Sequence, residues 1–404
     1  MRQTETTETT PASSPERGVR DRDVNGAALA DFVDRSVARA LAPGVVVGVF
    51  DAGRVAFLHA AGALDVAAAA PLTTDAIFRI ASMTKPITSL AAMMLVEEQA
   101  IALDDPAAQY LPELARLRVL AAFDEANGTW DSRPPARPVT ILHLLTHTSG
   151  VTYPFLDPRL AKIDDGRKSR ADVPLLHDPD ERFSYGPGTA ILGSIVAKVS
   201  GRPLEEFCRT RIFEPLGMVD TGYAVPAAGR GRVVTQRRRD ADGFVEQPNP
   251  EIIESRGRGD DGLFSTAADY GRFMQLFLNG GMANGARLVK EATLHAMTSN
   301  QIGALRIGLH PAVPGAIAEP FPLGGEKDTF GFGFQVETPP RRAADGRSAG
   351  SVSWSGIFNT YFWIDPETRL GVVVLMQFLP AHDSGAIEIL TGVERIVYTG
   401  SAGP

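Results

Sequence analysis

The sequence predicts an α/β protein in which an antiparallel sheet, flanked by helices, is built from both ends of the chain around a mainly helical insertion. Two observations lead to this prediction. Apolar runs with the period of strands occur near the N-terminus and again toward the C-terminus. The middle third is mostly helix and loop. This order is typical of one split α/β domain that holds a helical insertion.

Three elements are expected near the N-terminus. The stretch Asp51-Ala52-Gly53 separates two apolar runs, and this pattern indicates a β-hairpin. After the hairpin, apolar residues recur at helical spacing. The expected elements are a helix over 25–41, strands over 45–50 and 54–58, and a helix over about 82–99.

The middle and the C-terminal part follow different periods. Helices are expected over 138–145, 191–199 and 267–278. The period then changes to that of strands separated by polar turns, as in an antiparallel meander. The expected C-terminal elements are strands over 330–336, 351–354, 360–364 and 371–376, and a helix over about 386–398.

The chain divides into a tail and one folded unit. Residues 1–24 are rich in Thr, Glu, Ser and Pro and are predicted to be flexible. Residues 25–404 form the folded unit. Its α/β part takes in about 25–85 and 262–404, and its helical part about 86–261.

Composition excludes several classes of function. A net charge of −8, from 40 basic and 48 acidic residues, gives no reason to expect a nucleic-acid partner. No apolar stretch reaches about 18 residues, so no membrane span is expected. Because the N-terminus has acidic residues and lacks the apolar core of a signal peptide, a cytoplasmic location is expected. Nothing in the sequence fixes the oligomeric state.

No metal site or cofactor is expected. Cys208 is the single cysteine, which rules out an intramolecular disulfide and a zinc site made of several cysteines. His143 and His147 are four residues apart on a predicted helix, but no acidic residue or third ligand accompanies them, which favours a structural role. The basic run 236–240 is short and is expected to be a solvated loop face.

The strongest chemical signal is the run Ser82-Met83-Thr84-Lys85. A serine hydroxyl is a poor nucleophile at neutral pH and needs a base beside it. Ser82 and Lys85 are three residues apart, so on a helix they lie on one face within hydrogen-bonding reach. Pro86 favours a helix that begins here, since proline is tolerated in the first turn. Such a pair also occurs by chance, so it needs support from other motifs.

Four segments that follow one another along the chain provide that support. They are 78–88 (FRIASMTKPIT), 144–150 (LLTHTSG), 182–187 (RFSYGP) and 262–269 (GLFSTAAD). Together they resemble the serine β-lactamase-like superfamily, which includes class C β-lactamases, D-alanyl-D-alanine carboxypeptidases and family VIII carboxylesterases. The resemblance spans about residue 25 to the C-terminus and implies the fold of that superfamily.

The resemblance implies roles for three side chains. Ser82 would be acylated. Tyr185, as a phenolate or through a proton shared with Lys85, would act as the general base and return the proton to the leaving group. These three residues are the expected catalytic set.

The superfamily's third motif, Lys/His-Thr/Ser-Gly, is expected on a strand that lines the site. Its positions are occupied here by Trp354, Ser355 and Gly356, which would contact the substrate. By analogy, the backbone N–H groups of Ser82 and Ile357 would form the oxyanion hole, and Gly356 would let the substrate approach the strand.

Two positions depart from the pattern of β-lactamases. Trp354 stands where a cation usually binds the carboxylate of β-lactams and D-alanyl peptides, and Pro187 replaces an asparagine whose amide contacts the β-lactam side chain. Both departures resemble the family VIII carboxylesterases. They favour esters over penicillins.

The predicted function is a carboxylesterase-type serine hydrolase that cleaves small-molecule esters through an acyl-enzyme on Ser82. Three alternatives stay open. The same acyl-enzyme could serve an acyltransferase, or a β-lactamase or D-amino-acid peptidase. The non-enzyme alternative is a catalytically silent scaffold, and the presence of Ser82, Lys85 and Tyr185 together argues against it.

Two other motifs carry less weight. The run 346–350 matches the G-x-S-x-G of α/β-hydrolases, but it follows a polar turn and precedes no predicted helix. Arg258-Gly259-Asp260 matches an adhesion tripeptide only in its letters.

Overall fold

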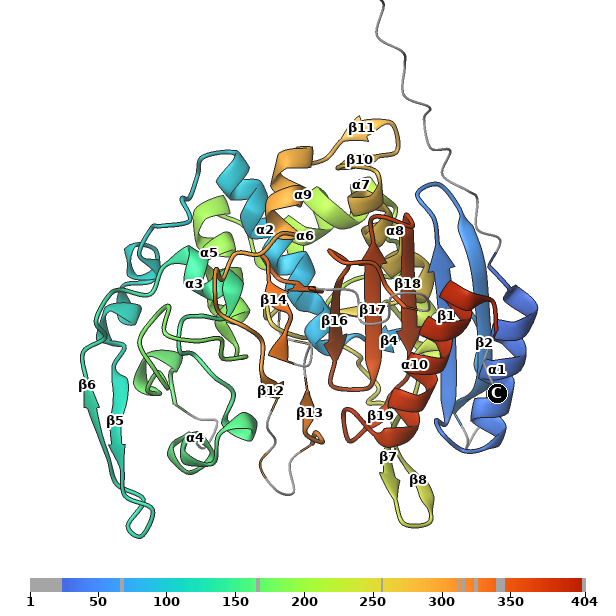
Figure 1. Ribbon diagram of the computed structural model, residues 1–404, viewed down its shortest axis with the longest axis horizontal. Coiled ribbons are helices and arrows are strands. Elements are labelled where there is room, and N and C mark those ends of the chain that lie inside the picture. Colours follow the sequence, from blue (N-terminus) through green and yellow to red (C-terminus); the bar gives the residue numbers. More distant parts are fainter. Residues whose placement is uncertain are drawn as a thin grey trace, which may run out of the picture.

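An eight-stranded antiparallel sheet forms the centre of the structure, with the strand order β14-β15-β16-β17-β18-β1-β2-β3. The two ends of the chain meet where β18 pairs with β1 (Figure 1). This confirms the predicted sheet. The computed structural model describes residues 24–65, 69–164, 168–255, 257–310, 313, 317–322, 326–338 and 346–401. The tail predicted for residues 1–24 lies, except for Val24, outside these residues.

The predicted strands of this sheet are present with one exception. The single strand expected over 330–336 is wrong, because the segment folds into two short antiparallel strands, β14 and β15. Gly333, between them, has a φ of +91°, a conformation that glycine adopts readily. The strands are β1 Gly44–Phe50, β2 Val55–Asp65, β3 Ala70–Pro71, β14 Thr329–Phe330, β15 Gln335–Val336, β16 Val352–Gly356, β17 Thr360–Asp365 and β18 Leu370–Leu375.

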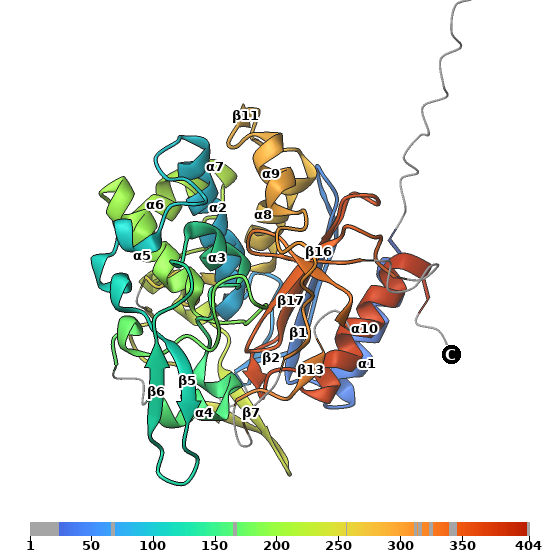
Figure 2. The ribbon, with the colours of Figure 1, turned by 60° about the vertical axis from the view of Figure 1, so that its left-hand side comes forward.

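Both faces of the sheet are covered by helices, and successive side chains of a strand point to opposite faces, so β1 contributes to two cores. On β1, Val45 and Val47 pack in one core, whereas Val46 and Phe50 pack in the other. Figure 2 shows α1 and α10 on one face and α2 and α8 on the opposite side. These helices are α1 Gly26–Ala38, α10 Ser384–Thr399, α2 Thr84–Glu97 and α8 Ala267–Leu278.

The segment between β3 and α8 holds the helices α2 to α7 among loops, and it also contains two hairpins that the sequence did not predict, β5–β6 and β7–β8. Its elements are β4 Phe78–Arg79, α2, β5 Val119–Phe123, β6 Trp130–Arg133, α3 Ile141–Thr146, α4 Pro158–Ile163, α5 Gly188–Ser200, α6 Leu204–Cys208, α7 Glu214–Leu216, β7 Gln236–Asp240, β8 Gly243–Gln247 and β9 Phe264–Ser265. The later short elements are β10 Met282–Ala283, β11 Ala286–Arg287, α9 Glu291–Met297, β12 Leu309–His310, β13 Phe321–Pro322 and β19 Phe378–Leu379.

The basic run 236–240 is strand β7, so the prediction of a solvated loop face is wrong. Arg237 is 1% exposed. Its guanidinium donates to the Glu246 carboxylate at 2.7 Å and to the carbonyl of Ala63 at 3.0 Å. Charge-assisted hydrogen bonds compensate the burial of this cation.

A small two-stranded ladder positions the site. In it, Phe78 of β4 lies opposite Ser265 of β9. The ladder therefore brings the start of α2 next to residues 258–265, which lie far away in the sequence. Among the described residues, no helix has the length and apolar character needed to cross a membrane.

Candidate active site

Ser82 and Lys85 lie where β4 leads into α2. Ser82 sits in a 3₁₀ turn over Ala81–Met83, and Ala81 has a φ of +44°, which is uncommon for a residue with a side chain. Lys85, in the first turn of α2, is 1% exposed. Its Nζ lies 3.1 Å from Ser82 Oγ, so the contact expected from their spacing is present.

Lys85 makes two further hydrogen bonds. Its Nζ donates to the Tyr153 hydroxyl at 3.0 Å and to the backbone carbonyl of Asp260 at 2.8 Å. An ammonium group has three N–H donors. The three contacts therefore match the full donor capacity of protonated Lys85.

A carboxylate lies behind this lysine. The Asp260 side chain, which is 0% exposed, accepts from the Tyr153 hydroxyl at 2.6 Å and from Arg258 at 3.0 and 3.1 Å. Burial raises the pKa of Asp260, but the positive charge of Lys85 and the contacts with Arg258 outweigh burial and hold this pKa below its usual range. Burial, followed by the negative charge of Asp260, raises the pKa of Tyr153 well above its usual value. The site thus holds an ionised Asp260 next to a protonated Tyr153.

Tyr185 lies just before α5 and faces the same lysine. The Lys85 Nζ is 4.8 Å from the centre of the Tyr185 ring. The ring packs edge-on against Trp354 and against His147, each at 5.0 Å between centroids. Together with Ser82, Tyr185 lines a recess of about 40 Å³.

The end of β16 forms the wall across from Tyr185. Trp354, Ser355, Gly356 and Ile357 line the same recess as Ser82. Gly356 is required here, because a Cβ at this position would lie 2.4 Å from the carbonyl oxygen of Ile80. The structure therefore brings all the predicted site residues to one place.

Two larger cavities lie nearby, and the first of them shares lining residues with this recess. One, of about 370 Å³, includes Ser82 and Ile357 in its wall. Its other lining residues are mainly apolar but also include one cation and two acids: Phe155, Leu263, Ile317, Phe358, Arg79, Glu254 and Asp261. The other cavity, of about 430 Å³, shares Tyr153 with the first and is lined by Pro187, Arg170 and Arg258, among others.

His147 lies beneath the site and is neutral. Burial, reinforced by the positive charge of Lys85, lowers the pKa of His147 to about 3. Among the described residues, neither ring nitrogen has a hydrogen-bond partner. His143 instead belongs to the cap of α3, where its Nδ1 accepts from the Thr140 backbone N–H at 3.0 Å. The described part of the chain holds no group of three or more His, Cys, Asp or Glu side chains that could bind a metal ion.

The sequence did not reveal three residues of this network. Lys85 contacts Tyr153 and Asp260 directly, and Arg258 is linked to it through Asp260. Tyr153 follows the segment 144–150, and Asp260 precedes the segment 262–269. The position of these polar residues next to segments that resemble the family was the one signal in the sequence that could have indicated them. Gly259 allows the turn to approach α5, because a Cβ there would lie 2.3 Å from the Thr189 carbonyl oxygen.

The G-x-S-x-G run lies between β15 and β16 and has a structural role. Arg347 is 4% exposed and pairs with Glu337 at 2.6 Å. The backbone N–H of Ser348 donates to Asp365 at 3.0 Å. The segment is a loop between two strands and lacks the strand-to-helix elbow that this motif needs for catalysis.

Comparison with known proteins places these features in a family. Residues 29–391 match the family model described as Beta-lactamase. Protein Rv1367c of Mycobacterium tuberculosis is 30% identical over 405 aligned residues, which cover 95% of this chain and 96% of the relative. Lovastatin esterase of Penicillium rubens is 32% identical over 334 residues, which cover 77% and 82%. The solved structure of EstCE1, a hydrolase with promiscuous acyltransferase activity, superposes with a TM-score of 0.72 at 25% identity and covers 92% of this chain and 99% of its own.

Proposed function

This chain belongs to the β-lactamase family, and on that premise we propose that it is a carboxylesterase whose acyl-enzyme forms on Ser82. Its similarity to an esterase and to a hydrolase that also transfers acyl groups supports chemistry of this class. The observation that carries the proposal is the 3.1 Å contact between Ser82 Oγ and the buried Lys85 Nζ, in the wall of a largely apolar cavity.

The proposed reaction has two stages. Ser82 Oγ attacks the ester carbonyl carbon, and its proton passes to the base formed by Lys85 and Tyr185. The backbone N–H groups of Ser82 and Ile357 stabilise the oxyanion. The bond to the alcohol oxygen breaks, the alcohol takes the proton, and the acyl group stays on Ser82. Water then attacks the acyl-enzyme through the same base, which releases the carboxylic acid and restores the Ser82 hydroxyl.

The walls of the recess next to Ser82 favour neutral esters. Trp354 brings an indole, with no positive charge to bind a substrate carboxylate, to the recess next to Ser82. Pro187 has no side-chain amide. Phe155 and Phe358 line the larger cavity and suit an apolar acyl or alcohol group. These features support ester cleavage over hydrolysis of penicillins.

Acyl transfer is the second candidate function. An alcohol that took the place of water in the second stage would receive the acyl group from Ser82. The similarity to EstCE1 favours this candidate. The cavity beyond Tyr153, of about 430 Å³, offers room for an acceptor next to the one that includes Ser82.

The first test compares initial rates of p-nitrophenyl butyrate hydrolysis by the wild type and by Ser82→Ala. We expect a wild-type rate well above the background and loss of that rate in the variant. Ser348→Ala is the matched control, because Ser348 belongs to the G-x-S-x-G run and should not affect turnover. Equal rates in the wild type and Ser82→Ala would refute the proposal for this ester. Methanol added to the assay should yield methyl butyrate if the acyl-enzyme also transfers its acyl group.

A further inference from the structure

We propose that Tyr153 and Asp260 form an orienting pair, which holds the Lys85 amine so that its proton-accepting lone pair points at Ser82. The inference rests on the proposed function, since it concerns how Lys85 takes the proton from Ser82. Both residues act through Lys85, so they are positioning residues.

The direction of each hydrogen bond around Tyr153 is determined by Asp260. An ionised carboxylate has no proton to donate, so the single proton of the Tyr153 hydroxyl goes to Asp260 Oδ2, 2.6 Å away. The Tyr153 oxygen then has only lone pairs to offer Lys85, at 3.0 Å. The backbone carbonyl of Asp260, 2.8 Å from the same nitrogen, is also an acceptor only.

Lys85 therefore has to direct two N–H groups at these two acceptors. When the ammonium loses its third proton, the lone pair that remains points along the third direction, where Ser82 Oγ lies 3.1 Å away. The proton of Ser82 Oγ can then pass directly to Nζ. A lysine without these two fixed acceptors would rotate among several orientations, and a smaller fraction of them would be productive.

The surrounding charges keep this arrangement in place. Arg258 binds both oxygens of the Asp260 carboxylate. Burial and the charge of Asp260 keep Tyr153 protonated by raising its pKa, so Tyr153 does not compete with Lys85 or Tyr185 as a base. The other titratable groups that face Lys85 are Tyr185, the neutral His147 and the partly exposed Asp261.

The test uses Tyr153→Phe, Asp260→Asn and the double variant, with p-nitrophenyl butyrate as substrate. Each single change should lower kcat by about 100-fold and leave KM within about twofold. The double variant should fall little further, because both residues act through one nitrogen. Labelling of Ser82 by a serine-reactive phosphonate should slow in parallel. Tyr110→Phe is the matched control, since Tyr110 also donates to a carboxylate, that of Asp105, but away from the site.

The outcomes separate this inference from the proposed function. Tyr153→Phe keeps the ring and removes one oxygen, so its melting temperature should stay close to that of the wild type. Unchanged kcat and labelling in Tyr153→Phe would overturn the orienting pair, as would a higher KM at constant kcat. If the phosphonate did not label Ser82 in the wild type, the proposed function would fail, and the inference with it.

Discussion

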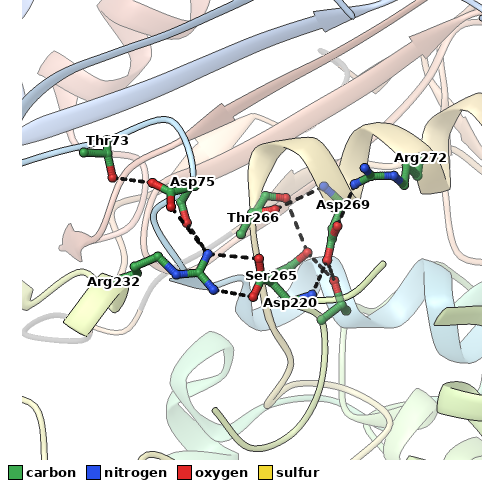
Figure 3. A network of polar contacts seen from close by, with 9 residues as sticks. Thr73, Asp75, Asp220, Arg232, Ser265, Thr266, Asp269 and Arg272 are labelled. Atoms are coloured by element: carbon green, nitrogen blue, oxygen red, sulfur yellow. Dashed lines mark hydrogen bonds and ion pairs between the residues drawn. The ribbon is translucent and has the colours of Figure 1, made fainter. Parts of the chain in front are cut away.

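Two polar networks lie at opposite ends of the β4–β9 ladder, and they differ in where their hydrogen bonds lead. The site network, defined by Ser82, Lys85, Tyr153, Arg258 and Asp260, follows β4 and precedes β9 in the chain. The clasp network, defined by Asp75, Asp220, Arg232, Asp269 and Arg272, precedes β4 and follows β9, with Asp220 and Arg232 joining it from the segment between them (Figure 3).

Charges of the clasp network are paired with one another. The Arg232 guanidinium donates to the Asp220 carboxylate at 2.9 Å and lies 3.7 Å from Asp75. Asp269, 1% exposed, accepts from the Asp220 backbone N–H at 2.7 Å and from Arg272 at 2.8 Å. Such a network holds segments of the chain together.

The site network instead leads to a hydroxyl that lines a cavity. Its hydrogen bonds run from Arg258 through Asp260 and Tyr153 to Lys85, and from there to Ser82. Similar chemical groups at the two ends of one ladder should therefore respond differently to mutation. Changes in the clasp network should cost stability, and changes in the site network should cost catalysis.

The largest expected effect comes from Lys85→Met. It removes the proton acceptor of Ser82, so kcat for p-nitrophenyl butyrate should fall by at least about 1000-fold while the protein stays folded by circular dichroism. Lys162→Met is the control, because Lys162 forms an exposed ion pair with Glu125. A loss of less than about tenfold would show that Lys85 is not the base.

Asp269→Asn should have the opposite effect, a loss of stability with little change in kcat. The neutral amide loses the charge that pairs with Arg272 and cannot accept all the present hydrogen bonds, so the free energy of unfolding should fall by about 1–3 kcal/mol. Urea unfolding measures this change. The value of kcat per folded molecule should stay within about twofold. A much lower kcat would show that the two networks are coupled, and the comparison would fail.

A smaller effect, taken per pH unit, is expected from His147, whose ring packs against Tyr185. The pKa of His147 is about 3, below the usual value near 6.5. At a pH between these two values, the unfolded chain therefore binds more protons than the folded chain. The free energy of unfolding should fall as the pH drops through this window, by at most about 1.4 kcal/mol per pH unit from this group. His147→Asn, which tolerates the φ of +56° at this position, should reduce that slope. Urea unfolding at two pH values within this window gives the pH dependence of the free energy of unfolding for the wild type and for His147→Asn. An equal pH dependence in the two proteins would contradict a lowered pKa of His147.

Local sequence patterns predicted the parts of the molecule that local forces determine. The helix Ala267–Leu278 was predicted with the bounds that the structure has, and Thr266 caps it by accepting from the Asp269 N–H. The contact between Ser82 and Lys85 follows from helical spacing alone. The run 330–336 misled because its phenylalanines suggest a strand, while Gly333 allows the turn that divides it.

Tertiary packing determines the rest of the site. Tyr153 and Asp260 are separated by 107 positions and meet only in the folded chain, where both contact Lys85. No periodicity relates them, and neither side chain is unusual in its own segment. Arg237 shows a related limit: its charge suggested solvent, but the unpredicted β7–β8 hairpin places Glu246 opposite it, and the fold adds the carbonyl of Ala63.

Peptide mapping by mass spectrometry after reaction with a serine-reactive phosphonate would identify the nucleophile directly. If Ser82 is the nucleophile, we expect a single adduct on Ser82 in the wild type and in Ser348→Ala, and no adduct in Ser82→Ala. An adduct on a different residue, or an unmodified Ser82 in the wild type, would contradict this role of Ser82.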